Sequence, residues 1–318
     1  MTRANDTGGH ANGTPAPPAP PTEGPSGFPA KTAAIMLVLC SIWGANFVAI
    51  KLGNQGFPPL FAAAVRSTGA ALLVALWATA TRRRILVDRR RLLDGVVMGA
   101  LFSLEFVFLY WGTSYTTASR SVLLMYTSPF WVALGAHFLL PNDRLSWLKI
   151  GGLALSFAGV AAVFRAPAGS LGSSHLVGDA MEVLGGFFWA ISTLYVKRTM
   201  PIRPMTTFQV LFYQLAFSAP ILWMAALIFK SGGGLSPSLG SAAALAYQTI
   251  IVATMSYLVW FWLMRSRHVS QLHSFTFFAP LFGVIFGGIF LGDPLPLLLW
   301  AGLALVATGT YLVNARRE

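Results

Sequence analysis

Ten apolar runs, separated by short polar breaks, make up most of this 318-residue sequence and decide what it can fold into. The runs cover residues 32–52, 58–80, 92–113, 118–140, 145–164, 178–196, 205–229, 241–264, 269–291 and 295–313. Most approach the roughly 20 residues with which a helix crosses a bilayer. Because lipid offers no hydrogen-bond partners, each run must satisfy its own backbone, which favours helices over open sheets. The pattern predicts an all-α integral membrane protein with ten transmembrane helices.

Composition supports this class and argues against several others. Hydrophobic residues make up 55% of the chain and charged residues 10%, whereas an average soluble domain is about 25% charged. The single cysteine, Cys40, excludes intramolecular disulfides and cysteine-rich metal sites. The sequence contains no Walker, HExxH, CxxC or GxSxG motif. We therefore expect no enzyme, no cofactor and no metal site.

The basic residues are placed asymmetrically along the chain. The net charge is +12, and 17 of the 22 lysines and arginines fall in segments on the same side as the N-terminus of a ten-helix topology. This positive-inside pattern predicts that both termini are cytoplasmic and that the protein is integral to the inner or plasma membrane. The cluster from Arg82 to Arg91 is expected to contact anionic lipid headgroups rather than nucleic acid. The Pro-rich residues 1–30 are expected to form a disordered cytoplasmic tail without a signal peptide.

The chain also matches itself, with residues 31–164 corresponding to residues 175–314. The matched pairs are Trp43 and Trp189, Lys51 and Lys197, Trp111 and Trp262, Ser119 and Ser270, Pro129 and Pro280, and Gly159 and Gly309. Five helices is an odd number, so the second copy would cross the membrane in the opposite sense. The sequence thus predicts two inverted five-helix repeats, an architecture common among secondary transporters.

Specific motifs within these repeats resemble a known family. They are the block Ser41-Ile-Trp-Gly-Ala-Asn-Phe-Val-Ala-Ile-Lys-Leu-Gly, the following Pro58-Pro-Leu with Arg66, the block from Ser114 to Phe130, and Asp143-Arg-Leu-Ser-Trp. Over about residues 31–314 the chain resembles EamA-type transporters of the drug/metabolite transporter superfamily. The resemblance implies ten helices in two inverted repeats and export of amino acids or other small metabolites, often aromatic or hydrophobic ones. It also implies a cavity lined mainly by helices 1, 3, 4, 6, 8 and 9.

Two charged residues lie inside apolar runs and need a reason to be there. Glu105 is midway through the third run, where a charged side chain costs about 2.5–3.5 kcal/mol on insertion scales. It could bind a substrate amine, couple protons, or form a structural hydrogen bond. Arg66 could bind a substrate carboxylate, snorkel to the interface, or pair with Glu105. By contrast, Glu182 lies near the outer end of its run, which favours a solvated mouth.

Aromatic and kink-forming residues complete the candidate site. Trp43 and Asn46 share one helix face, and Trp189 repeats this position in the second half. Pro129 and Pro280 are predicted hinges, with static bends as the alternative. The expected substrate-binding residues are Trp43, Asn46, Glu105, Tyr126, Trp189, Tyr257, His273 and Phe277, with Arg66 as a charge partner. His273 could equally be a packed hydrogen-bonding group.

The function predicted from these observations is a secondary transporter that exports a small organic metabolite, such as an amino acid, by alternating access. One alternative is an antiporter of phosphorylated or nucleotide-linked metabolites, which needs several cavity cations where the sequence offers only Arg66 and, further out, Arg120 and Lys51. Another is an integral-membrane lipid-modifying enzyme, which the scattered acidic residues disfavour. A channel-like or accessory protein is a third.

Overall fold

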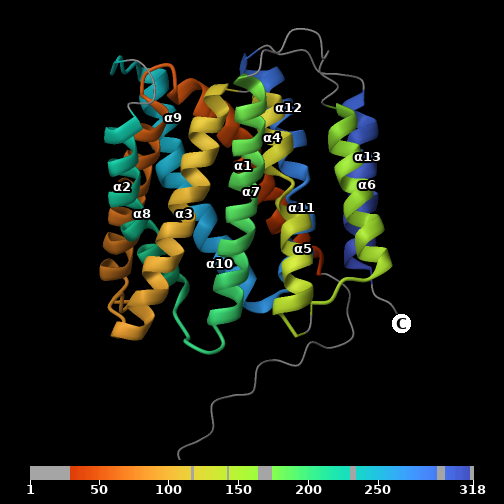
Figure 1. Ribbon diagram of the computed structural model, residues 1–318, viewed down its shortest axis with the longest axis horizontal. Coiled ribbons are helices and arrows are strands. Elements are labelled where there is room, and N and C mark those ends of the chain that lie inside the picture. The colour runs from red at the N-terminus through yellow and green to blue at the C-terminus, as the bar shows by residue number, and fades with distance from the viewer. Residues whose placement is uncertain are drawn as a thin grey trace, which may run out of the picture.

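The structure is a computed structural model that describes residues 29–115, 118–141, 143–163, 174–229, 234–291 and 298–315. In these ranges the regular structure is helical, without a strand, and the helices run side by side in one bundle (Figure 1). The predicted disordered tail lies outside the described residues, except for its last two positions.

The first half of the chain forms α1 (Ala30–Gly53), α2 (Pro59–Ala80), α3 (Arg89–Tyr115), α4 (Ala118–Met125), α5 (Ser128–Leu139) and α6 (Trp147–Val163). The second half forms α7 (Ser174–Thr199), α8 (Thr207–Phe229), α9 (Leu239–Tyr247), η1 (Gln248–Ser256), α10 (Tyr257–Ser266), α11 (Val269–Phe275), α12 (Phe278–Leu291) and α13 (Leu298–Asn314). Within the described ranges, six helical stretches are long and apolar enough to cross a membrane. Of the remaining apolar runs, residues 178–196 lie within the 26-residue helix α7, and the others form shorter helical segments. The chain is therefore a multi-pass helical membrane protein, and ten crossings remain a prediction.

Two of the predicted helices are broken in the same way. In the break between α4 and α5, the backbone N–H and the hydroxyl of Thr127 both donate to the carbonyl of Leu124, at 3.1 and 2.7 Å. In the break between α11 and α12, Thr276 makes the same two bonds to His273, at 3.0 and 2.7 Å. Pro129 and Pro280 therefore lie in the first turn of the following helix, where a missing N–H is tolerated. The sequence suggested that these prolines kink continuous helices, but each one follows a break between two helices.

The run 241–264 is interrupted differently, by the nine-residue π-helical segment η1 between α9 and α10. Ser238 begins α9 with a capping box to Ser241. Within η1, the Thr254 hydroxyl donates to the carbonyl of Thr249, five residues earlier, at 2.8 Å. Such segments are frequent at functional sites because they redirect side chains from the regular α-helical faces.

The helices pair across the two halves of the chain. Helix α6 packs along α13 at one edge of the bundle, α2 packs on α8, α3 on α7, and α1 on α12 (Figure 1). Close approach depends on glycine in places. A Cβ at Gly44 would come within 2.7 Å of the Ala279 carbonyl of α12, and one at Gly309 within 2.4 Å of the Gly152 carbonyl of α6. These pairings leave a space near the middle of the bundle between α1, α3, α7 and η1.

Candidate functional site: a charged cavity with aromatic walls

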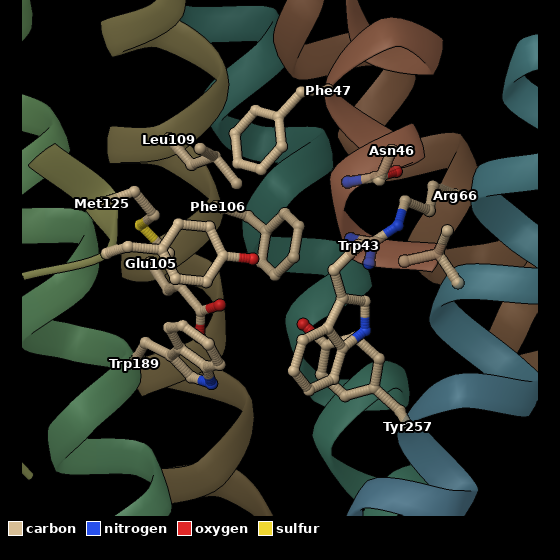
Figure 2. Close-up of a pocket in the computed structure, with 12 residues that line it drawn as sticks. Trp43, Asn46, Phe47, Arg66, Glu105, Phe106, Leu109, Met125, Trp189 and Tyr257 are labelled. Atoms are coloured by element: carbon tan, nitrogen blue, oxygen red, sulfur yellow. The ribbon is translucent and has the colours of Figure 1, made fainter. Parts of the chain in front are cut away.

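A partly open cavity lies between α1, α2, α3, α4, α7, η1 and α10 (Figure 2). It is lined by Trp43, Asn46, Phe47, Arg66, Glu105, Phe106, Leu109, Met125, Tyr126, Trp189, Val252 and Tyr257. A mainly apolar and aromatic lining with a few convergent polar groups is typical of small-molecule sites. We call this space the central cavity.

Aromatic rings form much of its wall. The ring centroids of Trp43 and Trp189 are 5.9 Å apart, and those of Tyr126 and Trp189 are 5.8 Å apart, both edge to face. The indole N–H of Trp43 donates to the Ser256 hydroxyl at 3.0 Å, which fixes the orientation of the ring. The matched tryptophans of the two halves thus meet at one site, contributed by α1 and α7.

Arg66 reaches this wall from α2 and is 1% exposed. Its Nε donates to the backbone carbonyl of Gln248 at 3.4 Å. Its guanidinium carbon lies 4.2 Å from the centre of the Phe106 ring and 5.9 Å from that of Tyr257, a cation–π arrangement. One of its nitrogens, Nη1, is buried without a hydrogen-bond partner. The snorkelling alternative is therefore wrong, because the side chain ends at the cavity rather than at the interface.

Glu105 extends from α3 on the other side of the cavity, as Figure 2 shows. It is 2% exposed, and its Oε2 is buried without a hydrogen-bond partner. None of the ion pairs in the described part of the chain joins it to Arg66. The Glu105 carboxyl and the Arg66 guanidinium therefore share one cavity without an ion pair between them, and each retains an unused hydrogen-bonding atom.

Gln248, at the start of η1, was not anticipated from the sequence. Its side-chain oxygen accepts a hydrogen bond from the Tyr110 hydroxyl, and its Nε2 donates to the Ala49 carbonyl at 3.1 Å. Since its backbone carbonyl also accepts from Arg66, Gln248 ties α1, α2 and α3 to the π segment. It positions the guanidinium without lining the cavity.

Two expected site residues pack behind the cavity rather than on it. His273 is fully buried, with its ring 4.9 Å from Trp189 and 5.1 Å from Trp260, and its Nε2 lies 3.3 Å from the Thr193 hydroxyl. Phe277 is also fully buried, 6.0 Å from the ring of Phe130. Both belong to the ninth run, which contributes no lining residue here. The second run, which was not expected to line the cavity, contributes Arg66.

The lining residues that sequence reasoning missed are Phe47, Phe106, Leu109, Met125 and Val252. Helical spacing could have found two of them, because Phe47 lies one turn after Trp43 and Leu109 one turn after Glu105. Met125 and Phe106 are chain neighbours of expected residues. Val252 had no signal, because it faces the cavity from the π segment.

Three further buried carboxylates lie away from the cavity, of which Asp94 of α3 pairs with Arg203 at 3.0 Å and accepts from the Tyr195 hydroxyl at 2.6 Å. Glu182 of α7 is 0% exposed, so the expected solvated mouth is wrong; its Oε1 accepts from the hydroxyls of Ser121 at 2.6 Å and Thr113 at 3.0 Å. Asp143, between α5 and α6, accepts from Lys149 Nζ at 2.8 Å and from the backbone N–H of Ser270 at 3.0 Å, and also from the Ser270 hydroxyl.

The charge state of Asp143 follows from these contacts. Burial alone would raise its pKa, but the Lys149 ammonium and the Ser270 hydrogen bonds outweigh burial and hold the pKa below the ordinary value.

Among the side chains that the structure describes, no three histidine, cysteine, aspartate or glutamate residues gather as a metal site.

Comparison with known proteins places the chain among transporters. The family described as the EamA-like transporter family matches twice, over residues 31–165 and 176–315. The chain is 26% identical to the uncharacterised transporter YvbV of Bacillus subtilis, over 91% of this chain and 93% of that protein. It is also 26% identical to a Salmonella typhimurium protein named "Probable amino-acid metabolite efflux pump", over 89% of this chain and 94% of the relative.

A solved crystal structure has the same fold, with a TM-score of 0.74 at 17% identity, over 89% of this chain and 96% of the other. The expected family is thus confirmed, and with it the expectation of a membrane transporter. This chain belongs to the EamA-like transporter family.

Proposed function

We propose that the protein is a secondary transporter that exports a zwitterionic amino acid with an apolar or aromatic side chain by alternating access. The observation that carries this proposal is the placement of Glu105 and Arg66 on opposite sides of the central cavity, each with an unpaired polar atom. Buried charges without partners are unfavourable, and a ligand of complementary charge removes that cost. An α-ammonium group would bind Glu105, and an α-carboxylate would bind Arg66.

The walls of the cavity suit the rest of such a substrate. Trp43, Tyr126 and Trp189 line the cavity that Glu105 and Arg66 share, with Trp189 edge to face against each of the other two rings. An aromatic side chain gains about 0.5–1.5 kcal/mol from such ring contacts beyond the burial of its area, and an aliphatic one gains from burial itself. The name of the Salmonella typhimurium relative is consistent with an amino-acid substrate.

Alternating access is supported by the way the two halves correspond. The family model matches once in each half, and the breaks at Thr127 and Thr276 have the same hydrogen bonds. Helix α1 packs on α12 and η1, as α7 packs on α5 and α3. Two similar halves packed in this way can exchange conformations around a central site, which is the behaviour of inverted-repeat transporters.

The orientation follows from the charge distribution. Seventeen of the 22 basic residues fall on the side of the N-terminus in a ten-helix topology, so we place both termini and the Arg82–Arg91 cluster at the cytoplasmic face, against anionic headgroups. A phosphorylated substrate is disfavoured because Glu105 would repel it and Arg66 is the one cation among the lining residues of the described cavity.

Counterflow in proteoliposomes tests this function. Labelled phenylalanine or leucine should exchange saturably, whereas their methyl esters and N-acetyl derivatives, which each lack one of the two charges, should exchange poorly. Glu105→Gln and Arg66→Gln should each raise the apparent KM about tenfold or more, the loss expected for one charged hydrogen bond. Arg84→Gln, at an exposed arginine, is the matched control. Absence of saturable exchange for every amino acid would refute the proposal.

A further inference from the structure

Glu182 joins three helices at the end of the bundle opposite the α5–α6 connection. It projects from α7 and accepts hydrogen bonds from Thr113 of α3 and Ser121 of α4. The contact is close, since a Cβ at Gly112 of α3 would meet the same Glu182 oxygen at 3.1 Å. The side chain is fully buried and does not line the central cavity.

The surroundings of Glu182 leave its carboxylate half satisfied. Both hydroxyl hydrogen bonds go to Oε1, and Oε2 is buried without a partner. Two neighbouring helices, α3 and α4, present neutral hydroxyls to it, and on α7 the Asp179 carboxylate, one turn earlier, has the same charge sign. No ion pair to Glu182 is formed by the described side chains; the side chain of Arg120 is not among them. A protonated carboxyl fits these surroundings better than an ionised one, because a buried anion needs a cation or several donors.

The same contacts link Glu182 to the cavity. Ser121 lies one turn before Met125, which lines the cavity, and Tyr126 follows Met125 at the break before α5. On α7, Trp189 lies two turns after Glu182, and between them a Cβ at Gly186 would come within 2.5 Å of the Met125 carbonyl. A movement of α4 relative to α7 therefore changes the cavity wall and the hydrogen bonds of Glu182 together.

We propose that Glu182 is a proton-binding site, distinct from the substrate-binding cavity, and that a proton bound there moves inward as the substrate moves outward. The inference rests on the proposed transport function and adds the coupling ion to it. When α4 and α7 separate at the outer end, Glu182 meets outside water and takes up a proton on its unpaired Oε2. When the central cavity next opens inward, water entering through it takes that proton from Glu182 to the inside. No bond other than the O–H bond of the carboxyl forms or breaks.

The test compares two measurements on the same reconstituted protein. Counterflow at equal pH reports substrate exchange, and accumulation driven by an acid-inside pH gradient, with the membrane potential clamped, reports proton coupling. Wild type should show both, with accumulation several-fold above the level at equal pH. Glu182→Gln should keep most of the counterflow and lose the gradient-driven accumulation. Glu105→Gln, by contrast, should weaken both.

Three outcomes would overturn the inference while leaving the transport function intact. They are wild-type counterflow without pH-driven accumulation, unchanged accumulation in Glu182→Gln, and accumulation driven by a sodium gradient at matched pH instead. Loss of counterflow in wild type itself would instead refute the proposed function, so the two failures are distinguishable.

A second variant keeps the test decisive if Glu182→Gln does not fold. Thr113→Val with Ser121→Ala retains the carboxylate and removes both hydroxyl donors. Because those donors stabilise the ionised form more than the protonated form, their loss should shift the pH profile of counterflow to higher pH by a unit or more. A profile that does not move would count against a proton site at Glu182.

Discussion

Glu182 and Asp143 are buried carboxylates at opposite ends of the bundle, and each binds a serine in the first part of a broken helix. Glu182 of the second half accepts from Ser121 of α4 in the first half, and Asp143 of the first half accepts from Ser270 of α11 in the second. In each case a carboxylate of one half of the chain is hydrogen-bonded to a short helix of the other half. The difference is the partner charge, because Asp143 has Lys149 at 2.8 Å and Glu182 has two neutral hydroxyls.

This difference separates a permanent anchor from a switchable one. The charge pair at Asp143 keeps the connection between α5, α6 and α11 in place over the ordinary pH range. In the proposal above, the Glu182 carboxyl, held by two neutral hydroxyls, takes up or releases a proton according to whether water reaches it. A transporter that opens alternately at its two ends would then have a proton-sensitive contact at one end alone.

The largest effect on stability should follow from removing the charge of Asp143. Asp143→Asn leaves Lys149 without its counter-ion and should lower the free energy of unfolding by about 3 kcal/mol, the order expected for breaking a buried ion pair. Thermal unfolding in detergent measures this. Asp88→Asn is the matched control, because its pair with Arg91 is exposed and should change stability by less than about 1 kcal/mol. Equal effects in the two variants would remove the distinction.

Removing a serine hydroxyl should also cost more unfolding free energy at Asp143 than at Glu182. Ser270→Ala removes a hydrogen bond to a paired, ionised carboxylate and should cost about 1.5–3 kcal/mol of unfolding free energy. Ser121→Ala removes a bond to a protonated one and should cost about 0.5–1.5 kcal/mol. The same unfolding assay compares them. If Ser121→Ala were the more damaging change, Glu182 would have to be charged in the folded protein.

Glu182→Gln should be milder still. The amide keeps an oxygen that can accept from Ser121 and Thr113, and a protonated carboxyl loses no charge on substitution. We expect a change of less than about 1 kcal/mol in unfolding free energy. A loss as large as that of Asp143→Asn would contradict the contrast between the two anchors.

The smallest effect is in the acid dependence of stability. Because the folded pKa of Asp143 lies below its ordinary value of 3.8, its stabilisation is complete above that value and disappears as the pH falls through the lowered folded pKa. The stability difference between wild type and Asp143→Asn should therefore be constant near neutral pH and shrink only in strong acid. Melting curves across the acid range measure it; a difference that shrinks already near neutral pH would show that Lys149 does not hold the charge.

Sequence patterns predicted the helices well because length and hydropathy alone decide which segments remain in lipid. They placed Trp43, Glu105 and Trp189 on one cavity, since helical spacing and the internal match are local properties. They failed where distant contacts decide. Glu182 is buried, and its hydrogen-bond partners Thr113 and Ser121 come from two other helices.

Arg66 shows the same limit. Nothing near it in the chain indicates that Gln248 would hold its Nε and that Phe106 would lie under its guanidinium. The sequence predicted hinges or static bends at Pro129 and Pro280, whereas the structure has helix breaks two to four residues before these prolines. Threonine hydrogen bonds end α4 and α11 before the prolines are reached.

The π segment η1 has a consequence for how this cavity can be altered. Its wider turns change which helix face each later residue occupies, compared with a continuous α-helix. Since an α-helix advances about 100° per residue, deleting a single residue between Gln248 and Ser256 would rotate Tyr257 relative to Gln248 by roughly that angle. Val252 and Tyr257 could then no longer face the cavity together while Gln248 holds Arg66. The number of residues in η1, rather than the identity of any one side chain, therefore fixes how Gln248 is oriented relative to Val252 and Tyr257.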